Sequence, residues 1–82
     1  MKKEYILDLS NLITLNRFVM EITSKIPCDV DAIHGRQVID AKSVLGLVSI
    51  AIHPVKVRIN TDDKTCLDNF NEICQEYKAK EK

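Results

Sequence analysis

The sequence predicts a two-layer α/β sandwich, in which helices with one apolar face cover a sheet with one apolar face. Two patterns support this prediction. Three short segments alternate apolar and polar side chains, as strands do, and two others repeat apolar residues every three or four positions, as helices do. A further strand is expected after a hairpin turn, and a further helix after the N-cap Ser43. Their order along the chain is β-α-β-β-α-β-α. Since 82 residues suffice for one small core, we expect a single domain over residues 1–82.

The expected strands cover residues 3–9, 28–33, 36–40 and 55–60. The last is the clearest, because Val55, Val57 and Ile59 alternate with polar residues. Between the second and third strands, His34-Gly35 is interpreted as a two-residue hairpin loop. Glycine adopts a positive φ freely, and histidine tolerates one better than most residues.

The expected helices cover residues 11–26, 43–51 and 63–78. The apolar stripe of the first begins at Leu12, just after the good N-cap Asn11, and Pro27 stops the helix. The second follows Ser43, another good N-cap, but has no clean stripe because nearly all its residues are apolar. Residues 78–82 are expected to fray.

Composition argues against several classes of function. Twelve basic and twelve acidic side chains balance, so long-range attraction to nucleic acid or to an anionic membrane is not expected. No apolar run is long enough for a membrane helix, and the first residues lack the apolar region of a signal peptide, so we expect a cytoplasmic protein. Cys28, Cys66 and Cys74 show no C-x-x-C spacing and complete no zinc quartet with the two histidines. We therefore expect buried, reduced thiols, with no metal and no cofactor.

Two short motifs resemble the HPr family, the phosphocarrier of the bacterial phosphoenolpyruvate:sugar phosphotransferase system. Lys42-Ser43-Val44-Leu45-Gly46 resembles the family's Lys-Ser-(Ile/Leu)-(Met/Phe)-Gly segment. Ser24-Lys25, followed by Cys28-Asp29-Val30, resembles the end of its first helix and the start of its second strand. The resemblance runs from about Lys3 to Tyr77. It implies an open-faced sandwich with an antiparallel four-stranded sheet in the order 1-4-2-3.

The chain departs from the HPr family at the residue that carries the family's chemistry. HPr has Gly-(Leu/Ile)-His-Ala-Arg-Pro-Ala where its first helix begins. The histidine accepts phosphate from enzyme I, while the helix N-terminus and the arginine stabilise the phosphoryl oxygens. With the helices aligned, Leu12 stands at the histidine, Thr14 at the arginine and Leu15 at the proline. Because leucine has no nucleophile, the chain is similar to histidine-less HPr-like proteins, and we expect it not to be an enzyme.

Three functions stay open on this basis. The first is a regulatory or protein-binding module related to the sugar phosphotransferase system. The second is an active phosphocarrier with an unusual acceptor, although His34 and His53 are both expected away from the start of the first helix. The third is a thiol redox protein, for which the sequence shows nothing that would lower a cysteine pKa.

Ser43 and a set of apolar residues are the candidate sites. In Gram-positive HPr the matching serine is phosphorylated by a dedicated kinase, and the product is a corepressor, so the resemblance implies regulatory phosphorylation of Ser43. A plain helix N-cap is the alternative. The HPr positions that dock onto partners are apolar here too, and we expect an exposed binding surface that comprises Leu12, Ile13, Val44, Leu45 and Val48. It would bind proteins of the phosphotransferase system, transcription regulators or a second copy. Alternatively, the loop before Pro54 folds over these residues and buries them.

Overall fold

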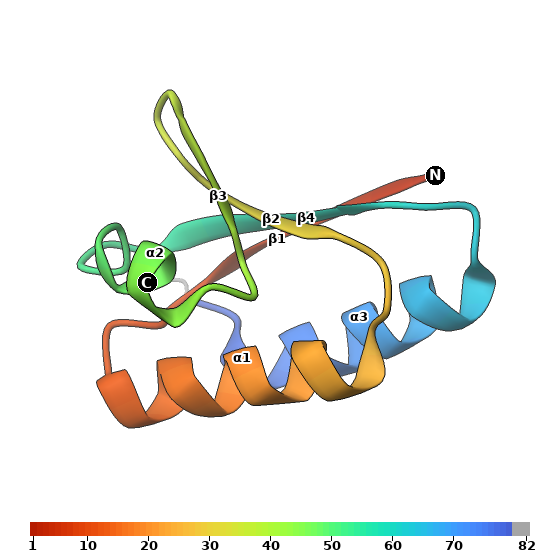
Figure 1. Ribbon diagram of the computed structural model, residues 1–82, viewed down its shortest axis with the longest axis horizontal. Coiled ribbons are helices and arrows are strands. Elements are labelled where there is room, and N and C mark those ends of the chain that lie inside the picture. The colour runs from red at the N-terminus through yellow and green to blue at the C-terminus, as the bar shows by residue number, and fades with distance from the viewer. Residues whose placement is uncertain (80–82) are drawn as a thin grey trace.

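The strands form one antiparallel sheet in the order β1-β4-β2-β3, and the helices pack on one face of it (Figure 1). In this computed structural model, which describes residues 1–79, the elements are β1 (Lys2–Leu7), α1 (Leu12–Lys25), β2 (Val30–His34), β3 (Gln37–Asp40), α2 (Val44–Val48), β4 (Val55–Asn60) and α3 (Lys64–Tyr77). The predicted sandwich, element order and strand order are therefore confirmed.

β4 lies at the centre of the fold because it pairs with β1 on one side and with β2 on the other. Its Val55, Val57 and Ile59 are fully buried beneath the helices, as the alternation predicts. On the open face, Arg58 lies opposite Glu4 of β1, and the Arg58 Nε to Glu4 Oε2 distance is 2.8 Å. The sheet therefore has one dry face and one solvated face.

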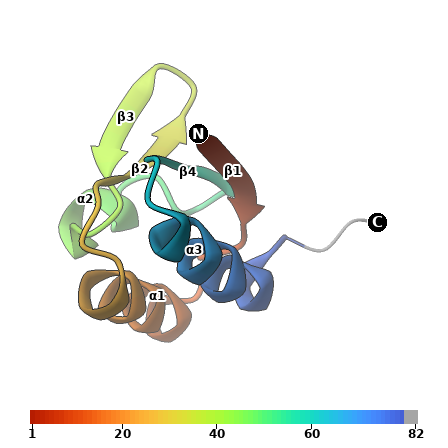
Figure 2. The ribbon, with the colours of Figure 1, turned by 90° about the vertical axis from the view of Figure 1, so that its right-hand side faces the viewer.

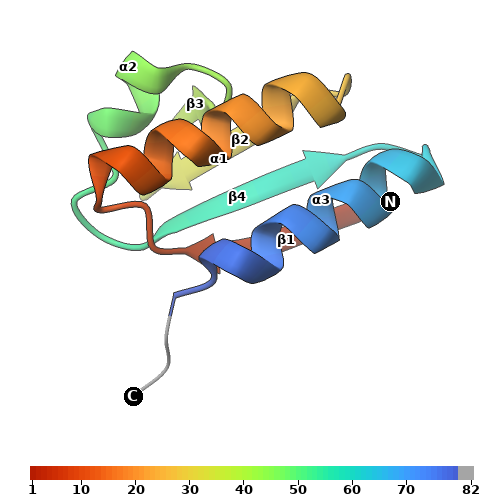
Figure 3. The same ribbon diagram turned by 90° about the horizontal axis from the view of Figure 1, so that it is seen from below.

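The helical layer consists of α1 and α3 side by side, with α2 beyond α1 near β3 (Figures 2 and 3). α1 and α3 run antiparallel, and each is capped by a side chain, Asn11 for α1 and Asp63 for α3. Phe18 and Phe70 are fully buried where these helices meet the sheet. The amphipathic stripes that predict α1 and α3 thus form most of the core.

The hairpin turn lies one residue later than predicted. β2 ends at His34, which pairs with Gln37, so the two central turn residues are Gly35 and Arg36. Gly35 has a φ of 59°, and among the described residues only this glycine has a positive φ. Glycine at the first central position is typical of a type II′ turn, which requires no positive φ from histidine.

β2 begins at Val30 instead of residue 28, and two elements end at least two residues earlier than predicted. β1 ends at Leu7 instead of residue 9, because Leu7 pairs with Val55 and the next residue along is Pro54, which has no N–H for the ladder. α2 ends at Val48 rather than at residue 51. Ile50 is nonetheless buried, so the turns after α2 cover the core without helical geometry.

The chain after α3 returns to β1. Leu7 and Lys78 form an isolated antiparallel bridge, and the Ala79 N–H donates to the Ile6 carbonyl at 3.0 Å. The predicted fraying is therefore wrong for residues 78 and 79, because backbone bonds hold them. Residues 80–82, which the same prediction covers, lie outside the described part of the chain.

Candidate functional site

The start of α1 is a capped helix end with its first backbone donors already occupied. The Asn11 Oδ1 atom accepts hydrogen bonds from Ile13 N at 2.9 Å and from Thr14 N at 3.2 Å. Leu12 is the first helical residue, as the resemblance to HPr predicts, and its side chain is exposed. A phosphoryl group at this helix end would have to compete with Asn11 for these donors.

A carboxylate lies just before the same helix end. The Asp8 Oδ1 atom accepts from Ser10 Oγ at 2.7 Å and from Ser10 N at 3.1 Å. These hydrogen bonds lower the pKa of Asp8, so it carries a negative charge at neutral pH. Such a charge repels an anion near the start of α1.

Arg17, the arginine next in sequence to this helix end, is held elsewhere. Its Nε donates to the Tyr77 hydroxyl at 3.0 Å, and its guanidinium carbon lies 5.4 Å from the Tyr77 ring centre. The same hydroxyl donates to Glu21 Oε2 at 3.0 Å. Arg17 therefore ties α1 to the end of α3 and does not replace the arginine of HPr.

The two histidines lie next to each other. The rings of His34, at the end of β2, and His53, in the turn before β4, stack with their centroids 5.9 Å apart and their planes at 15°. Local sequence patterns do not indicate this pair, since 19 positions separate its members. Neither histidine is among the residues that line the hollow beside Leu12.

That hollow lies between the start of α1 and the end of α2, and it has a volume of about 250 Å³. All but one of its lining residues are apolar, namely Leu9, Leu12, Leu15, Val48, Ala51 and Ile52, with Ser10 as the exception. Leu12, Val48 and Ile52 are 63%, 42% and 78% exposed. The hollow thus presents aliphatic side chains to water.

Two more exposed aliphatic residues adjoin the hollow along the chain. Ile13 follows Leu12 in α1, and Leu45 precedes Val48 by three residues, which places it on a neighbouring part of the α2 surface. Ile13 is 81% exposed and Leu45 is 87% exposed. We use the name apolar patch for the set Leu12, Ile13, Leu45, Val48 and Ile52.

Val44 does not point outward as predicted. It is half-buried and packs against the core, because the first residue of α2 faces the sheet side of this short helix. Ile52, which the predicted surface did not include, takes part instead. Its position in a turn, beyond the end of α2, gives it an orientation that helical spacing cannot predict.

Ser43 caps α2, since its Oγ accepts from Gly46 N at 3.2 Å. The side chain is only half-exposed. Gly46 also lies close to β3, because a Cβ there would lie 2.5 Å from Ile39 Cγ2. The cap and the glycine together seat α2 on the sheet edge.

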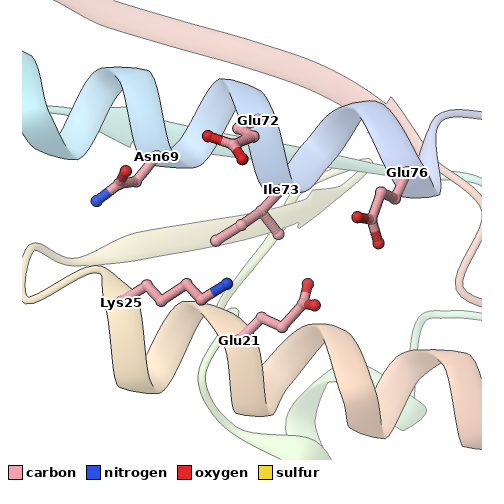
Figure 4. A pocket seen from close by; sticks show the side chains of 6 residues that line it. All are labelled: Glu21, Lys25, Asn69, Glu72, Ile73 and Glu76. Atoms are coloured by element: carbon pink, nitrogen blue, oxygen red, sulfur yellow. The ribbon is translucent and has the colours of Figure 1, made fainter.

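A second hollow, of about 230 Å³, lies between α1 and α3. Figure 4 shows its lining, with Glu21 and Lys25 of α1 facing Asn69, Glu72, Ile73 and Glu76 of α3. The carboxylate of Glu21 already accepts from Tyr77, and Lys25 supplies a positive charge among three glutamates. This mixed, open lining is typical of solvated helix surfaces and offers no convergent set of groups for one ligand.

Two of the cysteines predicted to be buried thiols lie in contact, and Cys28, one of the two, is only partly buried. Cys28 Sγ is 2.9 Å from Cys66 Sγ, and a carboxylate oxygen of Asp63 lies within 4.8 Å of both sulfurs. The hydrogen bond with Cys28, followed by burial, raises the pKa of Cys66 to about 11. Cys74 is fully buried, which raises its pKa to about 12. Of the three cysteines, Cys28 and Cys66 are the two whose sulfur atoms lie in contact.

Comparison of the chain with protein-family models, with curated proteins and with solved structures gives no match. Among the described residues, no helix has the length and apolar content needed to cross a membrane. The chemistry of the apolar patch, of the start of α1 and of the cysteine pair is therefore what bears on function.

Proposed function

We propose that this protein is a histidine-less HPr-like domain that binds a partner protein through its apolar patch and carries no phosphoryl group. The hollow between α1 and α2 is the observation that carries the proposal, since it exposes several large aliphatic side chains at one place. The role of the protein would be regulation or assembly in a sugar phosphotransferase network in the cytoplasm.

The architecture supports the HPr-like part of the proposal. The element order and the 1-4-2-3 strand order agree with what the resemblance to HPr implies. Leu12 opens α1, and Ser43 caps α2, as the alignment of the motifs requires. Fold alone does not determine function, so the binding role rests on the patch.

The chemistry at the start of α1 argues against a phosphocarrier. Leu12 has no nucleophile, Asn11 occupies two backbone donors, and Asp8 adds a negative charge nearby. Arg17 is engaged by Tyr77. The features that hold a phosphoryl group in HPr are thus missing here. The groups in their place either disfavour a bound phosphoryl group or are already occupied by another contact.

Energetics favour coverage of the patch. Complete burial of a leucine or isoleucine side chain contributes about 1.5–3 kcal/mol relative to exposure. Leu12, Leu45 and Ile52 are each more than 60% exposed, so a partner that covers them recovers much of that free energy. An apolar surface on the partner fits this patch, because Ser10 is the one polar residue that lines the hollow.

Differential capture from extracts of the native host tests the proposal. Leu45→Asp puts a charge in the patch, while the helix start tolerates it because acidic residues are favoured there. Met20→Asp is the matched control, since Met20 is 67% exposed on α1 and does not line the hollow. Wild type and Met20→Asp should retain the same proteins, and Leu45→Asp should retain about tenfold less of them.

Thermal melts of all three proteins must show that the fold is kept. Equal capture by wild type and Leu45→Asp would contradict the proposal. If light scattering instead shows a dimer of the wild type that Leu45→Asp dissociates, the partner is a second copy of this chain. In that case the patch is still the interface.

Ser43 is the second part of the proposal. As the resemblance implies, phosphorylation there would add a charge of about −1.5 to −2 at the start of α2, two residues before Leu45 of the patch. The cap that Ser43 Oγ makes with Gly46 N explains the serine without a kinase. Treatment with the kinase that modifies HPr, followed by mass measurement of the intact protein, distinguishes the two interpretations.

A further inference from the structure

We propose that Cys28 and Cys66 form a site of reversible disulfide formation, by exchange with a low-molecular-weight disulfide. The two residues belong to different parts of the fold. Cys28 lies between α1 and β2, and Cys66 lies in the first turn of α3. Because the end of α1 and the start of α3 are neighbours in an antiparallel pair, these two parts of the chain meet at the end of the molecule away from α2 (Figure 3).

The geometry favours a bond between the two sulfurs. Their separation of 2.9 Å is inside van der Waals contact, and a disulfide of about 2.0 Å needs a further approach of only about 1 Å. Cys74, the remaining thiol, is fully buried and makes no such contact among the described residues.

Exposure assigns a different role to each thiol. Cys28 is partly exposed, whereas Cys66 is 2% exposed, so Cys28 is the more accessible of the two residues. Cys28 would therefore be the attacking thiol and Cys66 the resolving thiol. The partly buried contact between Cys28 Sγ and Thr61 Oγ1, at 3.5 Å, holds the Cys28 side chain toward its partner.

The exchange balances in two steps. The Cys28 thiolate attacks one sulfur of the external disulfide RSSR, which forms a mixed disulfide and releases RS⁻, and RS⁻ takes up the proton that Cys28 lost. Cys66 then loses its proton, attacks the Cys28 sulfur and expels the second RS⁻, which is protonated in turn. Two protein thiols and one RSSR thus give one protein disulfide and two RSH, and the external disulfide is the oxidant.

A metal site fits the same residues less well. Two thiolates bound tetrahedrally to zinc at about 2.3 Å lie about 3.8 Å apart, well beyond the observed contact. The third donor, Asp63, already caps α3 through hydrogen bonds from Thr65 N and Cys66 N. The observed arrangement is therefore closer to a disulfide than to a metal centre.

The test equilibrates reduced full-length protein with oxidised glutathione, blocks remaining thiols with iodoacetamide and measures the intact mass. In wild type and in Cys74→Ala, Cys28 and Cys66 should take up no alkyl group, their disulfide should lower the mass by two hydrogen atoms, and digestion should yield a peptide that links Cys28 to Cys66. Dithiothreitol should reverse these changes. Cys28→Ser is the matched control and should form no internal disulfide.

A second readout is thermal unfolding. The disulfide would close a loop of 38 positions, so the oxidised protein should melt about 10 °C or more above the reduced one. Cys28→Ser should show no such shift under the same treatment. The proposal is overturned if Cys28 and Cys66 remain fully alkylatable, if the disulfide contains Cys74, or if one equivalent of zinc protects both thiols and no disulfide forms.

Discussion

At the residue scale, Tyr77 joins the core to a polar network. Its side chain is 3% exposed and meets Phe18 edge to face, with ring centroids 5.3 Å apart. Its hydroxyl accepts from Arg17 and donates to Glu21, so burial of the ring leaves no polar atom without a partner. One residue thereby holds the end of α3 against α1.

Tyr77→Phe should lower the free energy of unfolding by about 1 kcal/mol near neutral pH, because it removes two hydrogen bonds whose partners regain water. Burial raises the pKa of Tyr77 above its ordinary value of about 10. A raised folded-state pKa gives stability that is full below about pH 10 and is lost as pH rises through the folded pKa. The difference in the free energy of unfolding between wild type and Tyr77→Phe should therefore become smaller near pH 11.

Urea denaturation of both proteins at each pH measures that difference. The pKa of Tyr5 is also raised by burial, but Tyr5 is present in both proteins, so its contribution to the pH dependence of stability cancels in the difference. A gap that stays constant from neutral to alkaline pH would show that the Tyr77 hydroxyl titrates as freely in the folded protein as in the unfolded chain.

Leu12 decides the chemistry at the start of α1. Incubation with phosphoenolpyruvate and enzyme I should leave the mass of the intact protein unchanged, because no imidazole follows the Asn11 cap. A histidine-containing HPr in the same reaction is the positive control. A mass increase of one phosphoryl group that is lost in acid would restore the phosphocarrier alternative, with the stacked His34 and His53 as the residues to map first.

At the element scale, α2 is the least predictable part of the fold. β4, α1 and α3 follow directly from alternation or from an apolar stripe, since each has one side in water. Almost every residue of α2 is apolar, so periodicity cannot tell that Val44 faces the core and Leu45 faces water. The contact of Gly46 with Ile39 sets that orientation, and it depends on where β3 lies.

Gly46→Ala tests how tightly α2 is seated. The new Cβ would lie 2.5 Å from Ile39 Cγ2, and isoleucine is stiff at χ1, so the helix or the strand must move. We expect a loss of about 1–2 kcal/mol in the free energy of unfolding, although alanine favours helix more than glycine does. In an Ile39→Ala background the same substitution should cost little, since the clashing atom is gone. Equal losses in both backgrounds would contradict this account.

Long-range pairs mark the limit of prediction from sequence. Strand spacing predicts the ends of β4, yet the end of β1 depends on Pro54 standing beyond its partner Val55. Likewise, Cys28, just after α1, and Cys66, in the first turn of α3, come into contact only after the strands assemble in their 1-4-2-3 order. Composition and local spacing do not predict such long-range contacts.

At the scale of the whole molecule, the two unusual features lie at opposite ends. The apolar patch occupies the α2 end, whereas the cysteine pair lies where α1 ends and α3 begins (Figure 1). Other exposed apolar side chains, such as Met20 and Val38, line none of the hollows described above. A formal net charge of zero does not favour long-range electrostatic attraction, so in the proposed function a partner would be recognised by close contact at the patch.

Site-specific photo-crosslinking in the living host tests this central claim most directly. A benzophenone side chain placed at residue 45, within the patch, should give adducts of discrete mass after irradiation, because a partner covers that position. The same group at residue 20, which is also exposed but lies off the hollow, should give none of these adducts. Adducts from position 20 alone, or none from position 45, would contradict the assignment of the α1–α2 hollow as the binding site.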